Sequence, residues 1–175
     1  MSRVLIIGPC GAGKSTLART LAPLLGLPLI HLDREYWRPG WQQTPDEQWR
    51  ARVEELIQRP RWIIDGNYGG TLELRLRRAT AVILLDPPRR VYLRRVIWRA
   101  LSQRGRTRPD MGDGCAERLD PEFVRYVWNF GRTRRPRLLE LKAQHAASLP
   151  FIHLRSRRDV AGLVSHARAR GELPA

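Results

Sequence analysis

Five short apolar runs punctuate the chain, and each is continuous rather than alternating with polar residues. The runs are Val4–Ile7, Leu29–Leu32, Trp62–Ile64, Ala81–Leu85 and Phe151–Leu154. A continuous apolar run of this length is typical of a strand that is covered on both faces. The pattern therefore predicts five buried strands.

Segments between these runs carry apolar residues every three or four positions, which is the spacing of one helix face. Such patterns begin near Leu17, Trp49, Leu93, Phe123 and Val160. Strands that alternate with helices favour a parallel sheet covered by helices. Because the carboxyl ends of parallel strands meet at one edge of the sheet, we expect ligands to bind along that edge.

Two segments predict where helices begin. Thr44-Pro45-Asp46-Glu47 has the pattern of a capping box with proline at the first helical position. Ser156 is placed to cap the last helix. The stretch 123–146 is predicted to be helical, with a break near Gly131 and Pro136.

Length and composition predict a single domain over residues 1–175. No run approaches the ~20 apolar residues of a membrane span, and the first apolar run begins too early to leave room for a signal peptide. Cys10 and Cys115 do not make a disulfide framework, so we expect a cytoplasmic protein without a membrane partner. Residues 103–119 form a long connector rich in Gly, Arg and Asp, which is typical of a functional or disordered segment.

A phosphate-binding loop follows the first apolar run directly. Residues 8–15 spell G-x-x-x-x-G-K-S, in which glycines let backbone N–H groups turn toward an anion and the next helix adds its positive dipole end. Lys14 is expected to reach the β- and γ-phosphates of ATP, and the Ser15 hydroxyl to hold Mg²⁺. Cys10 is interpreted as a small filler of the loop. The predicted nucleotide-binding residues are Gly8, Gly11, Ala12, Gly13, Lys14, Ser15 and Thr16.

Three aspartates follow predicted strands: Asp33, Asp65 and Asp86. A carboxylate at such a position can hold Mg²⁺ waters or an acceptor hydroxyl, or it can start a turn or cap a helix. We assign Asp65 to function because Gly66 permits a close backbone approach, and Asp33 to function as well. Asp86 precedes two prolines and is assigned to a turn or cap.

These segments together resemble the adenylate-kinase-like small-molecule kinases. The marks are the phosphate loop, "HLD" at 31–33, "WIIDGNY" at 62–68, "VILLDPP" at 82–88 and an arginine-rich lid. Within that group, "WRPGW" at 37–41 and the lid stretches 108–110 and 114–117 make the chain most similar to the family known as DNA topology modulation proteins (FlaR-related). The resemblance runs from Val4 to about Leu154, and "WIIDGNY" with "WRPGW" is its more selective part.

The resemblance implies an α/β P-loop NTPase fold, nucleoside- or shikimate-kinase-like, with a five-stranded parallel sheet in the order 2-3-1-4-5. It also implies phosphoryl transfer from ATP with Mg²⁺, in which Asp65 orders Mg²⁺ waters and Asp33 meets the acceptor hydroxyl. After Asp65, Asn67-Tyr68 stand where the Asp-Gly-Phe-Pro-Arg motif of nucleoside monophosphate kinases continues Phe-Pro-Arg, so the arginine that grips an acceptor phosphate is missing from its usual place. This departure counts against a nucleoside monophosphate as acceptor.

Four arginines precede and enter the presumed lid at 103–119: Arg99, Arg104, Arg106 and Arg108. Lid arginines in such kinases neutralise charge on the transferring phosphoryl group, and their donor fork matches phosphate oxygens. In a chain so rich in arginine, any one of them is more often a surface charge. Arg104 and Arg108 are the two that we assign to catalysis, with Lys14, Asp33 and Asp65.

Tyr36, Trp37 and Trp41 follow Asp33, and the sequence leaves two readings open. Their rings either form an apolar wall for an acceptor or pin a loop to the core. His31 and His153 lie in predicted strands and are interpreted as core residues with satisfied nitrogens. Nothing in the sequence has the spacing of a zinc site.

The net charge of +15 comes almost entirely from arginine. Such a charge favours polyanionic partners, and it also suits a site that handles several phosphates. The basic cluster at 132–137 could reach back to the lid or bind nucleic acid, and we interpret it as a solvated face. Along the sequence the aromatic residues do not interleave with basic ones, as they do in a stacking platform for single strands.

We therefore expect an ATP-dependent small-molecule kinase with an unidentified acceptor, working as a monomer or homodimer. The alternative is a nucleotide-regulated, DNA-binding or topology-modulating protein that uses ATP as a switch, which leaves nucleic acid open as a partner. A simple ATPase without a small acceptor is a weaker third reading.

Overall fold

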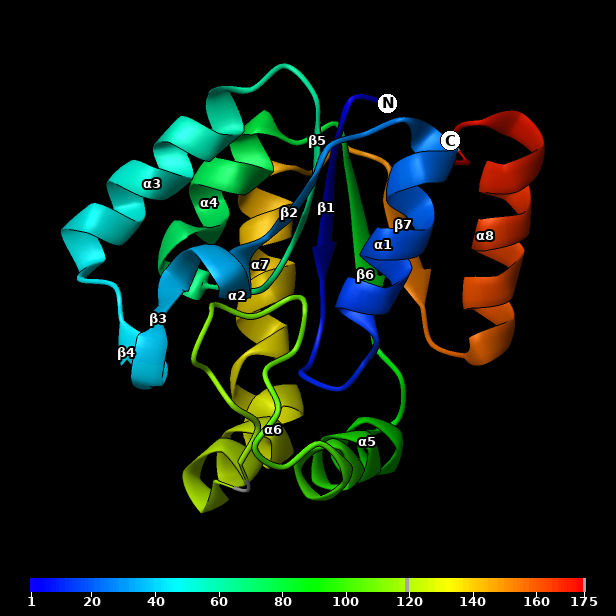
Figure 1. Cartoon of the computed structure of the whole chain (residues 1–175). Coiled ribbons are helices and arrows are strands. Elements are labelled where there is room, and N and C mark those ends of the chain that lie inside the picture. Colours follow the sequence, from blue (N-terminus) through cyan, green and yellow to red (C-terminus); the bar gives the residue numbers. More distant parts are fainter. Residues whose placement is uncertain (119, 175) are drawn as a thin grey trace.

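A computed structural model describes residues 1–118 and 120–174. Its centre is a parallel sheet of β1 (Arg3–Ile7), β2 (Leu29–His31), β5 (Trp62–Asp65), β6 (Ala81–Leu85) and β7 (Phe151–Leu154). The spatial order is β2-β5-β1-β6-β7, which is 2-3-1-4-5 when these five strands are numbered along the chain (Figure 1). The predicted α/β P-loop fold is confirmed.

Helices cover both faces of this sheet (Figure 1). On one side lie α1 (Lys14–Leu25) and α8 (Arg157–Arg170), and on the other α3 (Asp46–Gln58), α4 (Gly69–Arg78) and α7 (Arg135–His145). Two further helices, α5 (Arg89–Ser102) and α6 (Pro121–Thr133), lie below the carboxyl edge of the strands. No helix in the described part of the chain is long and apolar enough to span a membrane.

Successive residues of a strand enter opposite halves of the core. In β1, Leu5 and Ile7 pack toward α3, α4 and α7, whereas Val4 and Ile6 pack toward α1 and α8. All four are essentially without solvent exposure, and burying a side chain of this size stabilises the fold by roughly 1.5–3 kcal/mol. Burial on both faces is the reason that the strands are continuous apolar runs in the sequence.

The segment between β2 and α3 is more structured than its sequence predicts. The strand expected over Leu29–Leu32 ends at His31, because Leu32 begins the short helix α2 (Leu32–Tyr36). An antiparallel ribbon follows, in which β3 (Trp37–Arg38) and β4 (Gln42–Gln43) flank the 3₁₀ turn η1 (Pro39–Trp41). We call residues 37–43 the ribbon.

The capping box predicted at Thr44 is wrong. Helix α3 begins at Asp46 after Pro45, and no side chain caps it. The Thr44 hydroxyl instead donates to the Tyr36 carbonyl at 2.6 Å, so it closes the ribbon. The Thr44 side chain therefore makes a tertiary hydrogen bond in place of the local capping bond that its sequence context predicts.

The other helix-end predictions are confirmed. Ser156 caps α8 and forms a reciprocal capping box with Asp159. The long helical stretch breaks at Arg134, between α6 and α7, and Pro136 lies in the first turn of α7, where proline is tolerated.

The predicted lid segment, 103–119, folds back on itself and lies against the ribbon. Isolated bridges pair Arg104 with Glu117 and Thr107 with Ala116. The Trp41 Nε1–H donates to the Ala116 carbonyl at 2.9 Å. The last residue of the segment, Leu119, lies outside the described residues.

Candidate active site

The phosphate loop, residues 8–15, connects β1 to α1 with the backbone that its glycines permit. Gly8 and Gly11 have φ angles of 141° and 79°, in the region that favours glycine. A Cβ on Gly8 would collide with the Leu85 carbonyl, and a Cβ on Gly11 with the Tyr92 carbonyl of α5. Both the backbone angles and the close approach therefore require glycine.

The start of α1 is arranged to receive an anion. The helix begins at Lys14 without a side-chain cap, so its first-turn N–H groups are available to phosphate oxygens. The Lys14 Nζ donates to the Pro9 carbonyl at 3.2 Å and so lies within the loop. Burial raises the pKa of the Cys10 thiol, which keeps it protonated and agrees with its interpretation as a filler.

Ser15 and Asp65 form a pair suited to Mg²⁺. The Ser15 hydroxyl donates to Asp65 Oδ2 at 2.6 Å, and Asp65 is the buried last residue of β5. The described residues contain no group of three or more His, Cys, Asp or Glu that could hold a metal by themselves. A hydroxyl and a carboxylate fit Mg²⁺, since this ion usually keeps several waters and takes its remaining ligands from substrate phosphates.

His31 lies beside that pair. Its Nδ1 is 2.6 Å from Asp65 Oδ1, so the prediction of a satisfied nitrogen is confirmed for this atom. Because Asp65 receives Ser15 on one oxygen and His31 on the other, its carboxylate plane is fixed. The contribution of His31 to the site was missed in the sequence, where it reads as one more residue of a buried strand.

Asp86 is not the turn or cap residue that its sequence position predicts. Its Oδ2 lies 2.7 Å from Arg135 Nε and 3.0 Å from His153 Nε2. Helix α5 starts only at Arg89, after Pro88, and no side chain caps it. Because two prolines separate Asp86 from α5, its carboxylate does not cap that helix. It instead links Arg135 of α7 to His153 of β7.

Asp33, on α2, lines a cavity that the phosphate loop also lines. The Tyr68 hydroxyl donates to Asp33 Oδ1 at 2.7 Å. Burial raises the pKa of Asp33 above its ordinary value, although the hydrogen bond from Tyr68 and the charge of Lys14 act in the opposite direction. A carboxylate with a raised pKa is a better acceptor for the proton of a hydroxyl group.

The structure shows one of the two readings of the aromatic residues after Asp33, because Tyr36 packs against the core, and a wall for an acceptor stays a prediction. Tyr36, Trp37 and Trp41 line the cavity, as does Tyr68. Ring centroids lie 5.0 Å apart for Tyr36 and Trp37, 5.3 Å for Trp37 and Trp41, and 4.7 Å for Tyr36 and Tyr68. The cluster forms one wall of the cavity, and the Trp41 bond to Ala116 also pins the predicted lid segment to it.

Asn67 joins the end of β5 to the phosphate loop, a role that the sequence analysis did not assign. Its Oδ1 accepts the Gly8 N–H at 3.0 Å, and its Nδ2 donates to the Gly8 carbonyl at 2.8 Å. A side-chain amide that binds both the N–H and the carbonyl of one residue fixes the orientation of the two peptide units on either side of it. The signal was present in "WIIDGNY" but was interpreted as a missing arginine.

Arg75 was also missed, and it holds the loop that follows Asp65. Its side chain is 0% exposed, and its guanidinium donates to the carbonyls of Gly66 (2.9 Å), Asn67, Tyr68 (2.8 Å) and Thr71 (3.3 Å). Burial lowers the pKa of Arg75 to about 9. An arginine on an amphipathic helix ordinarily predicts a surface charge, so no pattern along the chain indicates this burial.

Arg108 and Arg99 meet at one carboxylate. Arg108 Nε lies 2.5 Å and Arg99 Nε 3.1 Å from Glu117 Oε1, and Arg108 also pairs with Asp110 at 2.8 Å. Both arginines line the cavity. Arg104 is exposed and is absent from the described lining, so its catalytic assignment stays a prediction.

One cavity of about 1590 Å³ joins these parts. It extends from the phosphate loop past Asp33 and the aromatic wall to the predicted lid segment and α6. Arg95 of α5, not predicted from the sequence, donates to the carbonyls of Gly11 (3.4 Å) and Ala12 (3.1 Å) and so braces the loop from below. The remaining lining arginines are Arg19, Arg118, Arg134, Arg137, Arg155 and Arg157.

Solved structures share this fold. Shikimate kinase from Acinetobacter baumannii in complex with shikimate is 19% identical, with a TM-score of 0.63 over 95% of this chain and 90% of that one. A putative kinase from Chloroflexus aurantiacus is 17% identical (TM-score 0.55, 97% and 98%), and a gluconokinase from Sinorhizobium meliloti 18% (0.53, 96% and 90%). No known family model and no curated protein sequence matches the chain. The similarity supports a P-loop kinase fold, and it does not show the DNA topology modulation family.

Proposed function

We propose that the protein is an ATP-dependent phosphotransferase that acts on a small hydroxyl compound. The observation that carries the proposal is one cavity lined by Asp33, Tyr68 and Ser15, the last of which is hydrogen-bonded to the buried Asp65. Ser15 and Asp65 form the pair at the phosphate loop, and Asp33 and Tyr68 form the pair that faces the aromatic wall. The kinases of the same fold, shikimate kinase and gluconokinase among them, support the reaction class.

The phosphate loop would hold the nucleotide. Its N–H groups and the start of α1 bind β-phosphate oxygens, and Lys14 leaves the Pro9 carbonyl to bridge the β- and γ-phosphates. Mg²⁺, when bound at Ser15 and Asp65, would neutralise charge on the same phosphates. Thr16 lines the cavity next to Ser15 and belongs to the same binding surface.

Asp33 would receive the proton of the acceptor hydroxyl as that oxygen attacks the γ-phosphorus. Tyr68 holds the carboxylate in position through its hydrogen bond. Arg108 and Arg99 are sequestered by Glu117 and would exchange this carboxylate for phosphoryl oxygens, which carry more negative charge. Arg104 would join them when the predicted lid segment closes.

A nucleoside monophosphate is disfavoured as the acceptor. The arginine of the Asp-Gly-Phe-Pro-Arg motif is missing, since Gly69 stands at its position, and the side chain of nearby Asn67 is bound to Gly8. Arg75, the next arginine after Asn67 along the chain, donates to backbone carbonyls and is 0% exposed. The aromatic wall and the Asp33 carboxylate suit an acceptor that carries a hydroxyl beside an apolar ring or face.

Nucleotide-regulated DNA binding stays an alternative that rests on the net charge of +15. Titrating duplex DNA at two salt concentrations tests it, because counterion release requires affinity to fall steeply with salt. A cytoplasmic location, a monomeric or dimeric state and a single domain remain predictions.

The test of the proposed function is a screen of hydroxyl compounds for ADP release above the rate of ATP hydrolysis. The panel contains neutral nucleosides, sugars, shikimate and gluconate, with Mg²⁺ present. We expect at least one class to raise ADP release, and Asp33→Asn to abolish the increase while ATP still binds. Acceptor-independent release at an unchanged rate over the whole panel would favour the simple ATPase.

A further inference from the structure

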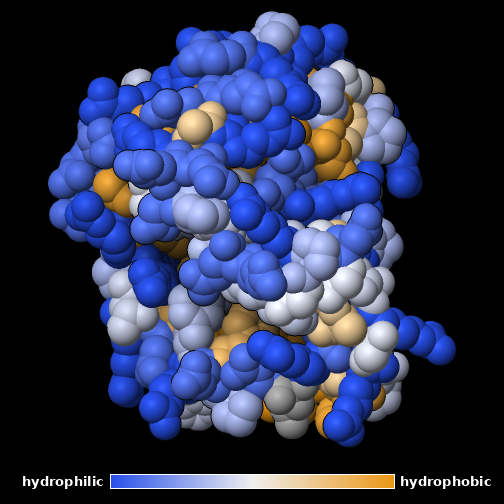
Figure 2. Space-filling view, turned by 60° about the vertical axis from the view of Figure 1, so that its left-hand side comes forward, coloured by the Kyte–Doolittle hydropathy of each residue, from blue (hydrophilic) through white to orange (hydrophobic). Residues whose placement is uncertain are grey.

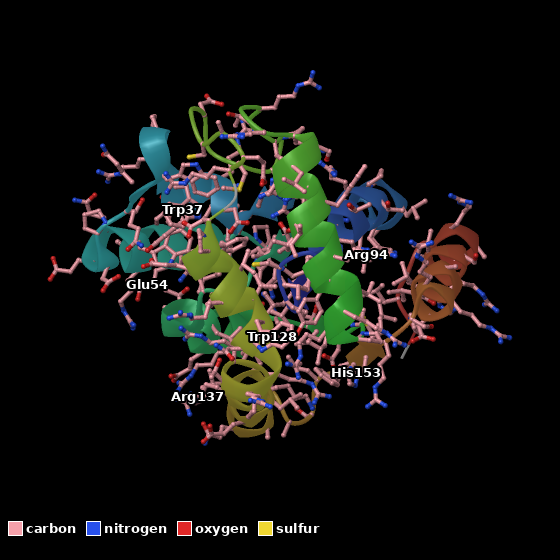
Figure 3. The ribbon with its side chains drawn as sticks, turned by 90° about the horizontal axis from the view of Figure 1, so that it is seen from below. Trp37, Glu54, Arg94, Trp128, Arg137 and His153 are labelled. Carbon is pink, nitrogen blue, oxygen red and sulfur yellow. The ribbon has the colours of Figure 1, made fainter. Side chains whose placement is uncertain are left out.

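A groove on the outside of α5 and α6 gathers most of the large apolar side chains that are exposed in the described residues. Large apolar side chains are exposed at four described positions, and three of them line this groove: Trp98 (70%), Leu101 (60%) and Trp128 (49%). Its volume is about 670 Å³, and Leu93, Ile97 and Pro88 complete the apolar lining. Figure 3 looks onto this side from below, with α5 and α6 adjacent and Trp128 between them.

This groove differs from the rest of the surface. The face drawn in Figure 2 is mainly hydrophilic, and hydrophobic residues appear on it in small patches. Exposed apolar side chains that cluster in one place usually mark a binding surface, whereas single ones need no explanation. The groove also lies outside the site described above, because the opposite side of α5 faces the phosphate loop through Tyr92 and Arg95.

Every charged residue that lines the groove is an arginine: Arg89, Arg90 and Arg94. Among the described residues none of these three has a carboxylate partner, which is also true of other exposed arginines such as Arg168 on α8. Three exposed arginines on α3, α4 and α7 do pair with glutamate. The pairs are Arg50–Glu54 on α3, Arg77–Glu73 on α4 and Arg137–Glu140 on α7. Arg89 instead lies over the Trp128 ring, with its guanidinium carbon 4.8 Å from the ring centroid.

These features decide between the candidate occupants. A second copy of the chain would oppose one rim of arginines with another. A single-stranded nucleic acid would find few free rings to stack on, because the floor is aliphatic at Leu93, Ile97 and Leu101. A lipid surface matches the tryptophans, the aliphatic side chains and the arginines of the groove. Indole rings favour the headgroup level, and aliphatic side chains favour the acyl boundary. Arginines bind the lipid phosphates.

We propose that the α5–α6 groove docks the protein onto an anionic bilayer surface. Trp98, Leu101 and Trp128 enter the boundary between headgroups and acyl chains, and the arginine rim contacts lipid phosphates. The sequence predicts no membrane partner because no segment could span a bilayer, but contact with one leaflet needs no spanning helix. The net charge of +15 attracts the whole molecule to the same surface.

The test is co-sedimentation of the full chain with vesicles of phosphatidylcholine alone and of phosphatidylcholine mixed with phosphatidylglycerol. We expect binding to the mixed vesicles, weakened by salt, and none to phosphatidylcholine. Arg90→Gln with Arg94→Gln should weaken partitioning roughly 30-fold, since each basic residue at the surface contributes about fivefold. Trp98→Ser with Leu101→Ser should weaken it by about tenfold or more.

The matched control is Arg50→Gln with Arg77→Gln, which removes the same charge from exposed positions on α3 and α4. This variant should keep nearly all of the binding, and each variant is accepted once its thermal unfolding matches that of wild type. Equal losses in the two arginine variants, with no loss in Trp98→Ser with Leu101→Ser, would reduce the effect to net charge and overturn the proposal. So would absence of binding to mixed vesicles, a Trp98-dependent dimer in sedimentation, or Trp98-dependent binding of oligothymidine in place of vesicles.

Discussion

The side-chain amide of Asn67 binds both the N–H and the carbonyl of Gly8, at 3.0 and 2.8 Å. It therefore couples the first residue of the phosphate loop to the strand end that carries Asp65. The Asn67 side chain thus helps to position both a nucleotide held by the loop and an ion held at Asp65. The predictions below follow from this coupling and from the groups that support it.

Asn67→Ala should lower the affinity for ADP by about tenfold, because it removes two hydrogen bonds that are each worth about 0.5–1.5 kcal/mol net. Calorimetric titration of wild type and variant measures the difference. Asn129→Ala, on the half-buried side of α6, serves as a substitution of the same type outside the loop. An unchanged ADP affinity in Asn67→Ala would show that the loop holds its shape without the amide.

Arg75→Met should lower the free energy of unfolding by about 3 kcal/mol or more, since several buried carbonyls lose their donor at once. Where the variant folds, the effect of Mg²⁺ on ADP affinity should shrink, because the loop after Asp65 is released. Arg77→Met removes an exposed arginine from the same helix and should change both quantities little. Equal stability of the two variants would contradict the role of Arg75.

Asp33→Asn should stabilise the fold at neutral pH while abolishing transfer to an acceptor. Because burial raises the pKa of Asp33 in the folded state, the native protein binds this proton more tightly than the unfolded chain does. The stability difference between variant and wild type should therefore appear as pH rises through the ordinary carboxyl range and vanish below it. Thermal unfolding over that pH range measures it, and a variant less stable at neutral pH would contradict the assignment.

Tyr68→Phe should shift the titration of Asp33 further upward. The Tyr68 hydroxyl donates to the carboxylate form at 2.7 Å and so lowers the pKa of Asp33. Carboxyl carbon NMR titrations of wild type and Tyr68→Phe, with Asp33→Asn to identify the signal, give the comparison. A titration midpoint of Asp33 that is unchanged or lower in Tyr68→Phe would show that the hydrogen bond does not act on the carboxylate.

The sequence predicted the sheet and the phosphate loop because both depend on local patterns. Continuous apolar runs such as Val4–Ile7 mark strands buried on two faces, and the glycines at 8 and 11 mark backbone angles that other residues avoid. The pairing of Ser15 with Asp65 followed from the rule that parallel strands end at one edge. The ribbon at 37–43 was not predicted, because strands of two residues are too short to show a hydrophobic periodicity.

Other features depend on contacts between distant residues. Thr44 and Asp86 had plausible local roles and found tertiary partners instead, at Tyr36 and at Arg135 with His153. The α5–α6 groove brings Trp98 and Trp128 together with three arginines, although aromatic and basic residues do not interleave along the chain in its sequence. Such arrangements are set by helix packing, which one sequence does not reveal.

The central claim is that residues 8–15 hold the phosphates of a nucleotide with Mg²⁺ bound beside them. Calorimetric titration of the full chain with ADP and ATP in the presence of Mg²⁺ tests it most directly. We expect saturable binding by wild type and a loss of about 100-fold in Lys14→Ala, which should unfold at nearly the wild-type temperature. Wild-type protein that takes up neither nucleotide at millimolar concentration would contradict the account.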